Sequence, residues 1–294
     1  MATRTLDGAP STLPLYLRAA LPALPVVGSL PGVRHASGDV PDLTLRREGV
    51  GTDVRALSDY AKVCGFSLGS ELPVTYPHMA AFALHLQLMC DTAFPFAPMG
   101  LVHLRNTIVQ HRPIGTGERF EVEVRGARLR PHPKGRLVDI DTSVTASGTL
   151  VWEEVTTLLA RGSGRGDEET APPLDGVEAP VGSTRWRLPA DLGRQYAAVS
   201  GDRNPIHLYQ VTAKAFGFPR QIAHGMWTKA RALAALQGRL PDAVRVDVEF
   251  RKPVLLPTTV QLGTSTDGDA TTFGVTSTRG DRTSTHLVGR ATPA

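Results

Sequence analysis

The sequence is short of cysteine, of net charge and of charged residues, and each shortage excludes a class of protein. Two cysteines, Cys64 and Cys90, are too few for a disulfide scaffold and form no CxxC motif, which favours a reducing, cytoplasmic compartment. A composition of 41% hydrophobic and 20% charged residues excludes a disordered chain, and with a net charge of only +4 we expect no nucleic-acid partner. The 294 residues have room for two ordinary domains or one large one.

The sequence also lacks a clean membrane-spanning segment. Its apolar N-terminal stretch, "STLPLYLRAALPALPVVGSLPG", is interrupted by Arg18 and broken by four prolines. It therefore fits neither the ~20 apolar residues of a membrane span nor the core of a signal peptide. We expect residues 1–40 to form a packing arm and no integral membrane segment, with a peripheral membrane contact as the alternative.

One stretch does carry charge of a single sign. Residues 125–136, "RGARLRPHPKGR", are basic without interleaved acids. Such a stretch can meet an anionic partner, for example a nucleotide-bearing cofactor or an acidic carrier protein. The alternative is a solvated face of a hairpin.

The chain is organised as two similar halves around a linker. Residues 161–184 are rich in Gly, Pro and acids and have no hydrophobic period, which is typical of a linker. On either side of it, "LSDYAKVCG" matches "GRQYAAVSG", and each is followed by an apolar run and then by strand-like segments. We therefore expect one domain over residues 41–160 and a second copy over residues 185–294.

Hydrophobic spacing predicts an α+β layer in each copy. Apolar residues of the second copy recur three and four apart, which indicates a helix: they are Ala223, Met226, Trp227, Ala230, Leu233 and Leu236. Later segments such as "RVDVEFRKPV" and "FGVTSTR" alternate with the period of strands. A long helix followed by antiparallel strands predicts a helix lying against a curled sheet.

The second copy has a set of polar residues that the first lacks at the matching places. "SGDRNPIH" stands opposite "CGFSLGSELP", so that Asp202, Asn204 and His207 have no counterparts. Gly201 and Pro205 favour a tight loop over a helix, which can turn the carboxylate and the imidazole toward one cavity. Such a pair can act as acid and base, although Asp and Asn are also common turn formers that cap helices.

The segment around these residues resembles the (R)-specific enoyl-thioester hydratases, also called hydratase 2 or MaoC-like dehydratases. The matching positions are Tyr196, Ala197, Ser200, Gly201, Asp202, Asn204, Pro205, His207, Ala213, Gly217, Phe218, Ala223, His224, Gly225 and Met226. Two residues after the histidine the family usually has an acid, and this chain has Tyr209. The two copies resemble the double hotdog subgroup, in which a degenerate N-terminal hotdog domain pairs with a catalytic C-terminal one.

The resemblance implies a reversible dehydration of 3-hydroxyacyl thioesters and a set of residues that perform it. Asp202 and His207 would hold the water, Asn204 would support them, and the N–H of Gly225 at a helix start would bind the thioester carbonyl. Substrate-binding residues would be Ser200, His224, Met226, Arg251 and Lys252, although His224 is also readily explained by packing. No cofactor and no metal is implied. The partner is an acyl-CoA or acyl carrier protein thioester, and the chain is a homodimer or a pseudo-dimeric monomer.

Two other functions stay open at this point, a hotdog acyl-thioesterase and a non-catalytic acyl-binding subunit. The first copy is expected to contribute packing and an acyl tunnel without chemistry. The helix expected from Pro77 to Cys90 and the cluster of Phe94, Phe96 and Pro98 would form the tunnel, or this cluster would only fill the core of its domain. Arg112, at a position of the repeat that corresponds to Arg251, is a further candidate for the phosphates of CoA.

Overall fold

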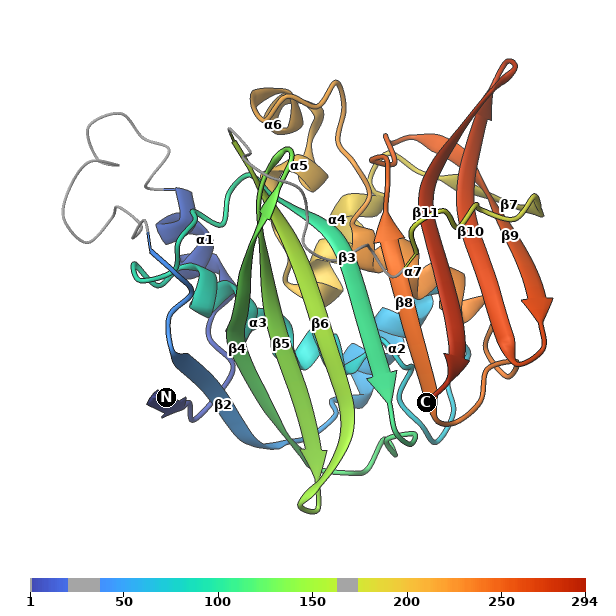
Figure 1. Cartoon of the computed structure of the whole chain (residues 1–294). Helices are drawn as coiled ribbons and strands as arrows, with labels where there is room; N and C mark the ends of the chain where they lie inside the picture. Colours follow the sequence, from blue (N-terminus) through green and yellow to red (C-terminus); the bar gives the residue numbers. More distant parts are fainter. Residues whose placement is uncertain (1, 21–37, 163–173) are drawn as a thin grey trace.

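The computed structural model describes residues 2–20, 38–162 and 174–294, in which the strands form one eleven-stranded sheet (Figure 1). The order across the sheet is β1-β2-β4-β5-β6-β3-β8-β11-β10-β9-β7. The strands are β1 (Ala2–Thr5), β2 (Leu43–Val50), β3 (Leu101–Gln110), β4 (Phe120–His132), β5 (Gly135–Ala146), β6 (Thr149–Arg161), β7 (Gly182–Leu188), β8 (Val244–Phe250), β9 (Thr258–Asp267), β10 (Ala270–Arg279) and β11 (Arg282–Pro293). The helices are α1 (Thr12–Ala20), α2 (Val54–Cys64), α3 (Pro77–Met89), α4 (Leu192–Ser200), α5 (Pro205–Leu208), α6 (Gln210–Ala215) and α7 (Gly225–Ala234).

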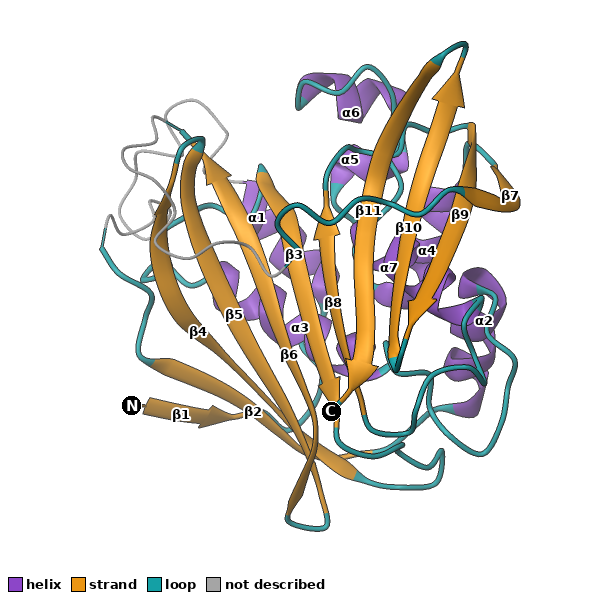
Figure 2. Cartoon of the chain, turned by 45° about the vertical axis from the view of Figure 1, so that its right-hand side comes forward, coloured by secondary structure: helices purple, strands orange, loops and turns teal. Residues whose placement is uncertain are grey.

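The sheet contains the same strand arrangement twice. The order β2-β4-β5-β6-β3 in the first half corresponds to β7-β9-β10-β11-β8 in the second. The halves join where β3 pairs antiparallel with β8, so that Arg105 lies opposite Glu249 and Gln110 opposite Val244. One chain thus builds the continuous sheet of a dimer, and the helices of both halves lie on the same side of it (Figure 2).

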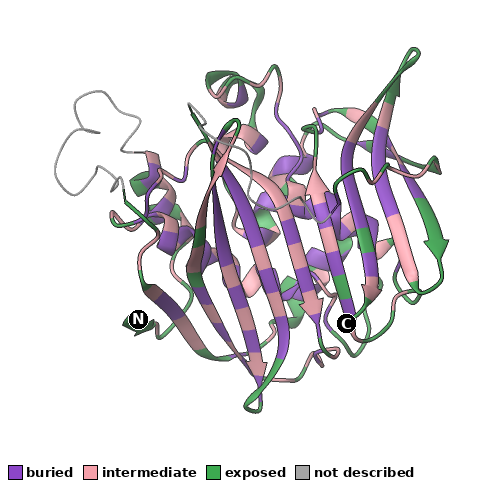
Figure 3. Ribbon diagram, viewed as in Figure 1, coloured by how far each residue is buried: buried purple, intermediate pink, exposed green. Residues whose placement is uncertain are grey.

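Alternation along the strands explains how the sheet is held to the helices. In β8, Val244, Val246 and Val248 are buried under the helical layer while Arg245 and Asp247 point the other way and pair with each other. The same alternation is visible along the other strands (Figure 3). Burying one such side chain stabilises the fold by about 1.5–3 kcal/mol. Because successive side chains of a strand point to opposite faces, the core takes an apolar residue at every second position, which is the predicted period of two.

The two long helices, α3 and α7, lie where the sequence predicts helices, and α7 begins at Gly225. The N-terminal stretch that was expected to be a packing arm has two described elements. β1 pairs parallel with β2, and α1 packs Leu15 and Ala19 against Leu86 and Cys90 of the first half. Residues 1 and 21–37 of this stretch lie outside the described residues.

The expected linker falls between β6, which ends at Arg161, and β7, which begins at Gly182. Residues 163–173 of it lie outside the described part, and Leu174 just after them is buried. None of the helices in the described ranges combines the length and the apolar character that crossing a membrane requires.

Candidate active site

The segment that carries the candidate acid and base is a turn between two helices. α4 ends at Gly201, whose φ of 76° lies in the left-handed region that favours glycine. Pro205 then opens the short helix α5, and the side chain of Asn204 caps it by accepting from the N–H of Ile206 at 3.4 Å. The expectation of a loop without helix is therefore wrong for His207, which lies in α5. Proline disfavours helical dihedrals at the residue before it, here Asn204, but is favoured at the first helical position, where its missing N–H costs nothing.

His207 is buried and its ring is oriented by one backbone contact. Its Nδ1 lies 2.8 Å from the carbonyl oxygen of Ile222, so Nδ1–H donates and Nε2 keeps the lone pair. Burial lowers the pKa of His207, against the opposing effects of Asp202 and Ile222. The residue is therefore a neutral imidazole with its free nitrogen available as a base.

Asp202 is held by three groups around its carboxylate. Oδ1 accepts from the hydroxyl of Tyr16 at 2.6 Å and from the N–H of Asn204 at 3.1 Å, while Oδ2 lies 3.7 Å from Nε2 of His224. Burial alone would raise the pKa of Asp202, but the neighbouring histidines and these hydrogen bonds bring it below its ordinary value. Its side chain is 24% exposed, so an ionised carboxylate faces the cavity.

His224 and Gly225 come from the start of α7. The ring of His224 stacks on that of His207 with centroids 3.7 Å apart, and its Nε2 lies 3.0 Å from the carbonyl oxygen of Asp202. Burial lowers the pKa of His224 to about 3, which keeps it neutral. Gly225 is the first residue of the helix, where the N–H groups have no partner inside the helix. A Cβ there would lie 3.1 Å from the ring of Phe250, which explains the glycine.

One cavity of about 790 Å³ collects the catalytic and substrate-binding residues that the family resemblance implies. Its lining includes Ser200, Asp202, Asn204, His207, His224, Gly225, Met226, Arg251 and Lys252. Ser200 supports the turn, because its hydroxyl donates to the carbonyl of Tyr196 at 2.8 Å and accepts from the N–H of Asp202 at 3.1 Å. Asn204 likewise acts on Asp202 through its backbone, since its side chain caps α5.

Other residues of the cavity were not proposed from the sequence. Tyr16 lies in the stretch that was interpreted as apolar packing, and α1 brings it to Asp202. The first half contributes His78, His85 and His103 to the lining, and none of the three was proposed from the sequence. The histidines are visible in "TYPHMAAFALHLQ" and "LVHLRN", but helical and strand patterns alone do not tell which face they share.

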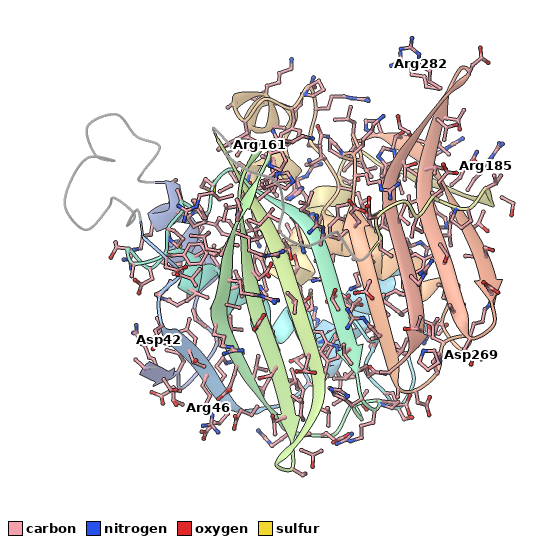
Figure 4. The ribbon with its side chains drawn as sticks, in the orientation of Figure 1. Asp42, Arg46, Arg161, Arg185, Asp269 and Arg282 are labelled. Atoms are coloured by element: carbon pink, nitrogen blue, oxygen red, sulfur yellow. The ribbon has the colours of Figure 1, made fainter. Side chains whose placement is uncertain are left out.

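Basic residues gather on part of the cavity wall. Lys134 of the predicted basic stretch, together with Arg161, lines it beside Arg251 and Lys252. Figure 4 labels Arg161 at the end of β6, with Arg46 at the opposite end of the sheet. Arg112 has a different role, because its guanidinium binds both carboxylate oxygens of Glu118 at 2.9 and 2.8 Å.

Among the described residues, two groups of side chains are close enough together to consider a metal ion. The possible ligand atoms of Asp202, His207 and His224 lie within 4.8 Å of one another, and so do those of His78, His85 and Glu154. Within the first group, His207 and His224 each use one ring nitrogen on a backbone carbonyl. Addition of water beside a thioester carbonyl needs only an acid and a base, which this group supplies.

Comparison with known proteins agrees with this geometry. Residues 176–286 match the family described as "MaoC like domain". The chain is 41% identical to 3-hydroxyacyl-thioester dehydratase X of Mycobacterium tuberculosis over 86% of this chain and 88% of that protein. The crystal structure of HtdX from the same organism superposes with a TM-score of 0.75 at 36% identity, covering 85% of this chain and 100% of that one.

A second solved structure from Mycobacterium tuberculosis has a double hotdog fold and matches with a TM-score of 0.54 at 13% identity, over 83% of this chain and 93% of that one, which shows the fold alone. The predicted α+β double hotdog is thereby confirmed, as is the predicted resemblance. With the close relative spanning most of both chains, the conclusion is that this chain belongs to the MaoC-like dehydratase family.

Proposed function

We propose that the chain catalyses the reversible dehydration of 3-hydroxyacyl thioesters to trans-2-enoyl thioesters, as a hydro-lyase of fatty acid metabolism. The observation that carries this is the joint placement of an ionised Asp202, a neutral His207 and the N–H of Gly225 on one cavity. Relatives are named 3-hydroxyacyl-thioester dehydratase X and peroxisomal enoyl-CoA hydratase 2. The proposed reaction uses no bound cofactor.

In the hydration direction, Asp202 and His207 hold one water between them as hydrogen-bond acceptors. The water oxygen forms a bond to C3 while the pair takes one proton from it, and one proton returns from the pair to C2. The net change adds a hydroxyl at C3 and a hydrogen at C2, and the pair ends as it began. Positioned acid–base groups of this kind contribute about 10²–10⁴-fold to a rate.

Gly225 stabilises the charge that develops during this step. As C3 is attacked, negative charge moves to the thioester oxygen, and the N–H at the start of α7 points at that charge with the positive end of the helix dipole behind it. A backbone donor of this kind is worth about 2.7–4 kcal/mol in the transition state. The Phe250 ring packs against this glycine and closes the site from the side of β8.

From this arrangement we also propose the stereochemical course of the reaction. Both members of the pair come from one turn, and the carbonyl is fixed from α7, so water and proton reach the same face of the acyl chain. The outcome is syn addition with a single product hand, which the resemblance to the hydratase family assigns as (R).

The basic wall of the cavity suits the carrier end of the substrate. Lys134, Arg161 and Lys252 offer positive charge to the phosphates of CoA or to an acidic acyl carrier protein. Arg251 is partly engaged, since it donates to the carbonyl of Val177 at 2.7 Å and lies 3.5 Å from Glu249. We propose that Lys134 and Arg161 contribute more than Arg251 to binding the carrier end of the substrate.

The acyl chain then runs toward the first half. α3 lines the cavity with Phe82, Leu86 and Met89, and Pro98 lines it as well. Phe94 does not, because it is fully buried in the core of the first half. Of the cluster expected from the sequence, Pro98 thus lies on the acyl path and Phe94 fills the core of its domain.

A purified chain tests the function directly. Crotonyl-, octenoyl- and hexadecenoyl-CoA, and the same acyl groups on an acyl carrier protein, should lose their enoyl absorbance and give only (R)-3-hydroxyacyl products. Release of free thiol in place of hydration would indicate the thioesterase, and binding without any turnover would indicate the acyl-binding subunit. We place the reaction in the cytoplasm, since Cys64 and Cys90 are buried and unpaired.

A further inference from the structure

The inner wall of the cavity is polar where it meets the first half. α3 and β3 place His78, His85 and His103 there, beside apolar residues such as Phe82. A plain hydrocarbon chain forms no hydrogen bond with an imidazole and would leave its polar atoms without partners. This end of the cavity therefore offers contacts that an unsubstituted acyl chain cannot use.

These histidines lie one aromatic ring beyond the catalytic groups. The Phe250 ring packs against Gly225, and the ring of His103 meets Phe250 edge-on with centroids 4.8 Å apart. On the other side, Phe82 lies next to the turn that precedes the catalytic loop, and its ring is 6.1 Å from that of His78. The imidazoles therefore face the acyl chain beyond its reacting carbons.

His103 presents a free hydrogen-bond acceptor. Its Nε2 is buried and has no hydrogen-bond partner among the described residues. Burial lowers the pKa of His103 to about 4, so the ring is neutral. A hydrogen bond to the backbone at Arg105 acts in the opposite direction and raises this pKa. A hydrogen bond raises the pKa of an imidazole when the ring N–H donates it to a carbonyl oxygen. The proton is therefore on Nδ1, and Nε2 carries a lone pair.

His78 belongs to a buried hydrogen-bonded chain behind His103. Its Nδ1 lies 2.8 Å from Oε2 of Glu154, whose other oxygen accepts from Asn106 at 2.7 Å. Burial alone would raise the pKa of Glu154, but His78 and Asn106 bring it to about 2, so the carboxylate is ionised and Nδ1 of His78 is the donor. Lys229 donates to the amide oxygen of Asn106 and completes the hydrogen-bonded chain to this carboxylate. Both oxygens of Glu154 are engaged without a metal ion.

We propose that this inner end binds a hydroxyl group carried by the acyl chain beyond its reacting carbons, with Nε2 of His103 as the acceptor. The inference rests on the proposed function and names its substrate class as hydroxylated acyl thioesters. A ketone or a methyl group at the same place has no hydrogen to donate to this nitrogen.

A set of enoyl-CoA substrates of equal length, each with one hydroxyl at a different carbon, tests the proposal. The measured quantity is kcat/KM of each isomer divided by that of the unsubstituted chain. In the wild type this ratio should exceed one for hydroxyls at one part of the chain. In His103→Phe it should fall about tenfold, the scale of one net hydrogen bond, and His103→Gln should restore part of it through its amide oxygen.

His111→Phe is the matched control, because His111 lies at the end of β3, is 41% exposed and contacts Glu153. It should change neither kcat/KM nor the ratio. The proposal would be overturned by a wild-type ratio that favours no hydroxyl position or by an equal loss on all substrates in His103→Phe. It would also be overturned if an enoyl-CoA with a keto group in place of the favoured hydroxyl had the higher kcat/KM. A wild type that turns over none of these thioesters would instead refute the proposed function.

Discussion

Replacing Tyr16 with Phe removes the hydrogen bond from α1 to Asp202 and keeps the ring. The bond is short, 2.6 Å, and charge-assisted. Bonds to charged groups contribute about 1.5–3 kcal/mol. For the bond from Tyr16 to Asp202 we take a contribution of about 1.5 kcal/mol, the lower end of this range. The lower end applies because Asn204 still donates to the same oxygen and the carboxylate is 24% exposed. Without the Tyr16 hydroxyl the ionised form loses a donor, so the pKa of Asp202 rises.

Since Asp202 acts as an ionised group, kcat/KM falls as the pH drops through its pKa. In Tyr16→Phe this fall begins at higher pH, so that kcat/KM in acid is about tenfold below wild type, the equivalent of 1.4 kcal/mol. At neutral pH both proteins hold an ionised carboxylate and the difference shrinks. The assay is the pH profile of enoyl-CoA hydration, with Tyr209→Phe as control, since Tyr209 is 55% exposed. An equal loss at every pH would mean that Tyr16 contributes only packing, and this reasoning would be refuted.

Three further predictions follow from the site. Asp202→Asn and His207→Ala should each lower kcat about a hundredfold or more while leaving the fold intact, and their effects should not add, because both act on one water; near-wild-type turnover in either would refute the assignment. Hydration in heavy water should give only (R)-3-hydroxyacyl-CoA with deuterium at one C2 position, and an (S) or racemic product would refute the role assigned to Asp202 and His207. Burial lowers the pKa of His85 to about 3 from an ordinary value near 6.5, so this group leaves the fold at full stability above pH 6.5 and costs it about 1.4 kcal/mol per pH unit as the pH falls toward 3; urea unfolding of His85→Gln should show a shallower fall.

Much of the fold follows from local patterns that the sequence displays. The period of two in "RVDVEFRKPV" predicts β8, and the three-and-four spacing after Ala223 predicts α7. The candidate acid and base could also be found from the sequence, because Asp202 and His207 lie within one short segment of the chain. Their shared cavity is a consequence of that proximity in sequence.

The remaining site residues are set by contacts over long distances along the chain. Tyr16 meets Asp202 across 186 positions, and nothing in the apolar pattern around it distinguishes a packing tyrosine from a donor. His103 reaches the cavity only because β3 pairs with β8 and so carries the first half up to Phe250. Local periodicity contains no information on which strands meet, so these residues could not be placed from the sequence.

The comparison of the two halves explains why a duplicated fold holds one reaction site. α7 begins at Gly225, whose N–H is the proposed donor to the thioester oxygen, whereas α3, its counterpart, begins at Pro77. Proline has no N–H, so the first half cannot supply the donor at the equivalent position. The connection before α3 also covers only residues 65–76, against residues 201–224 before α7, and it has no counterpart of α5 to carry a histidine. Donor and base are therefore both missing from the first half, and its side chains on the cavity are free to contact the acyl chain instead.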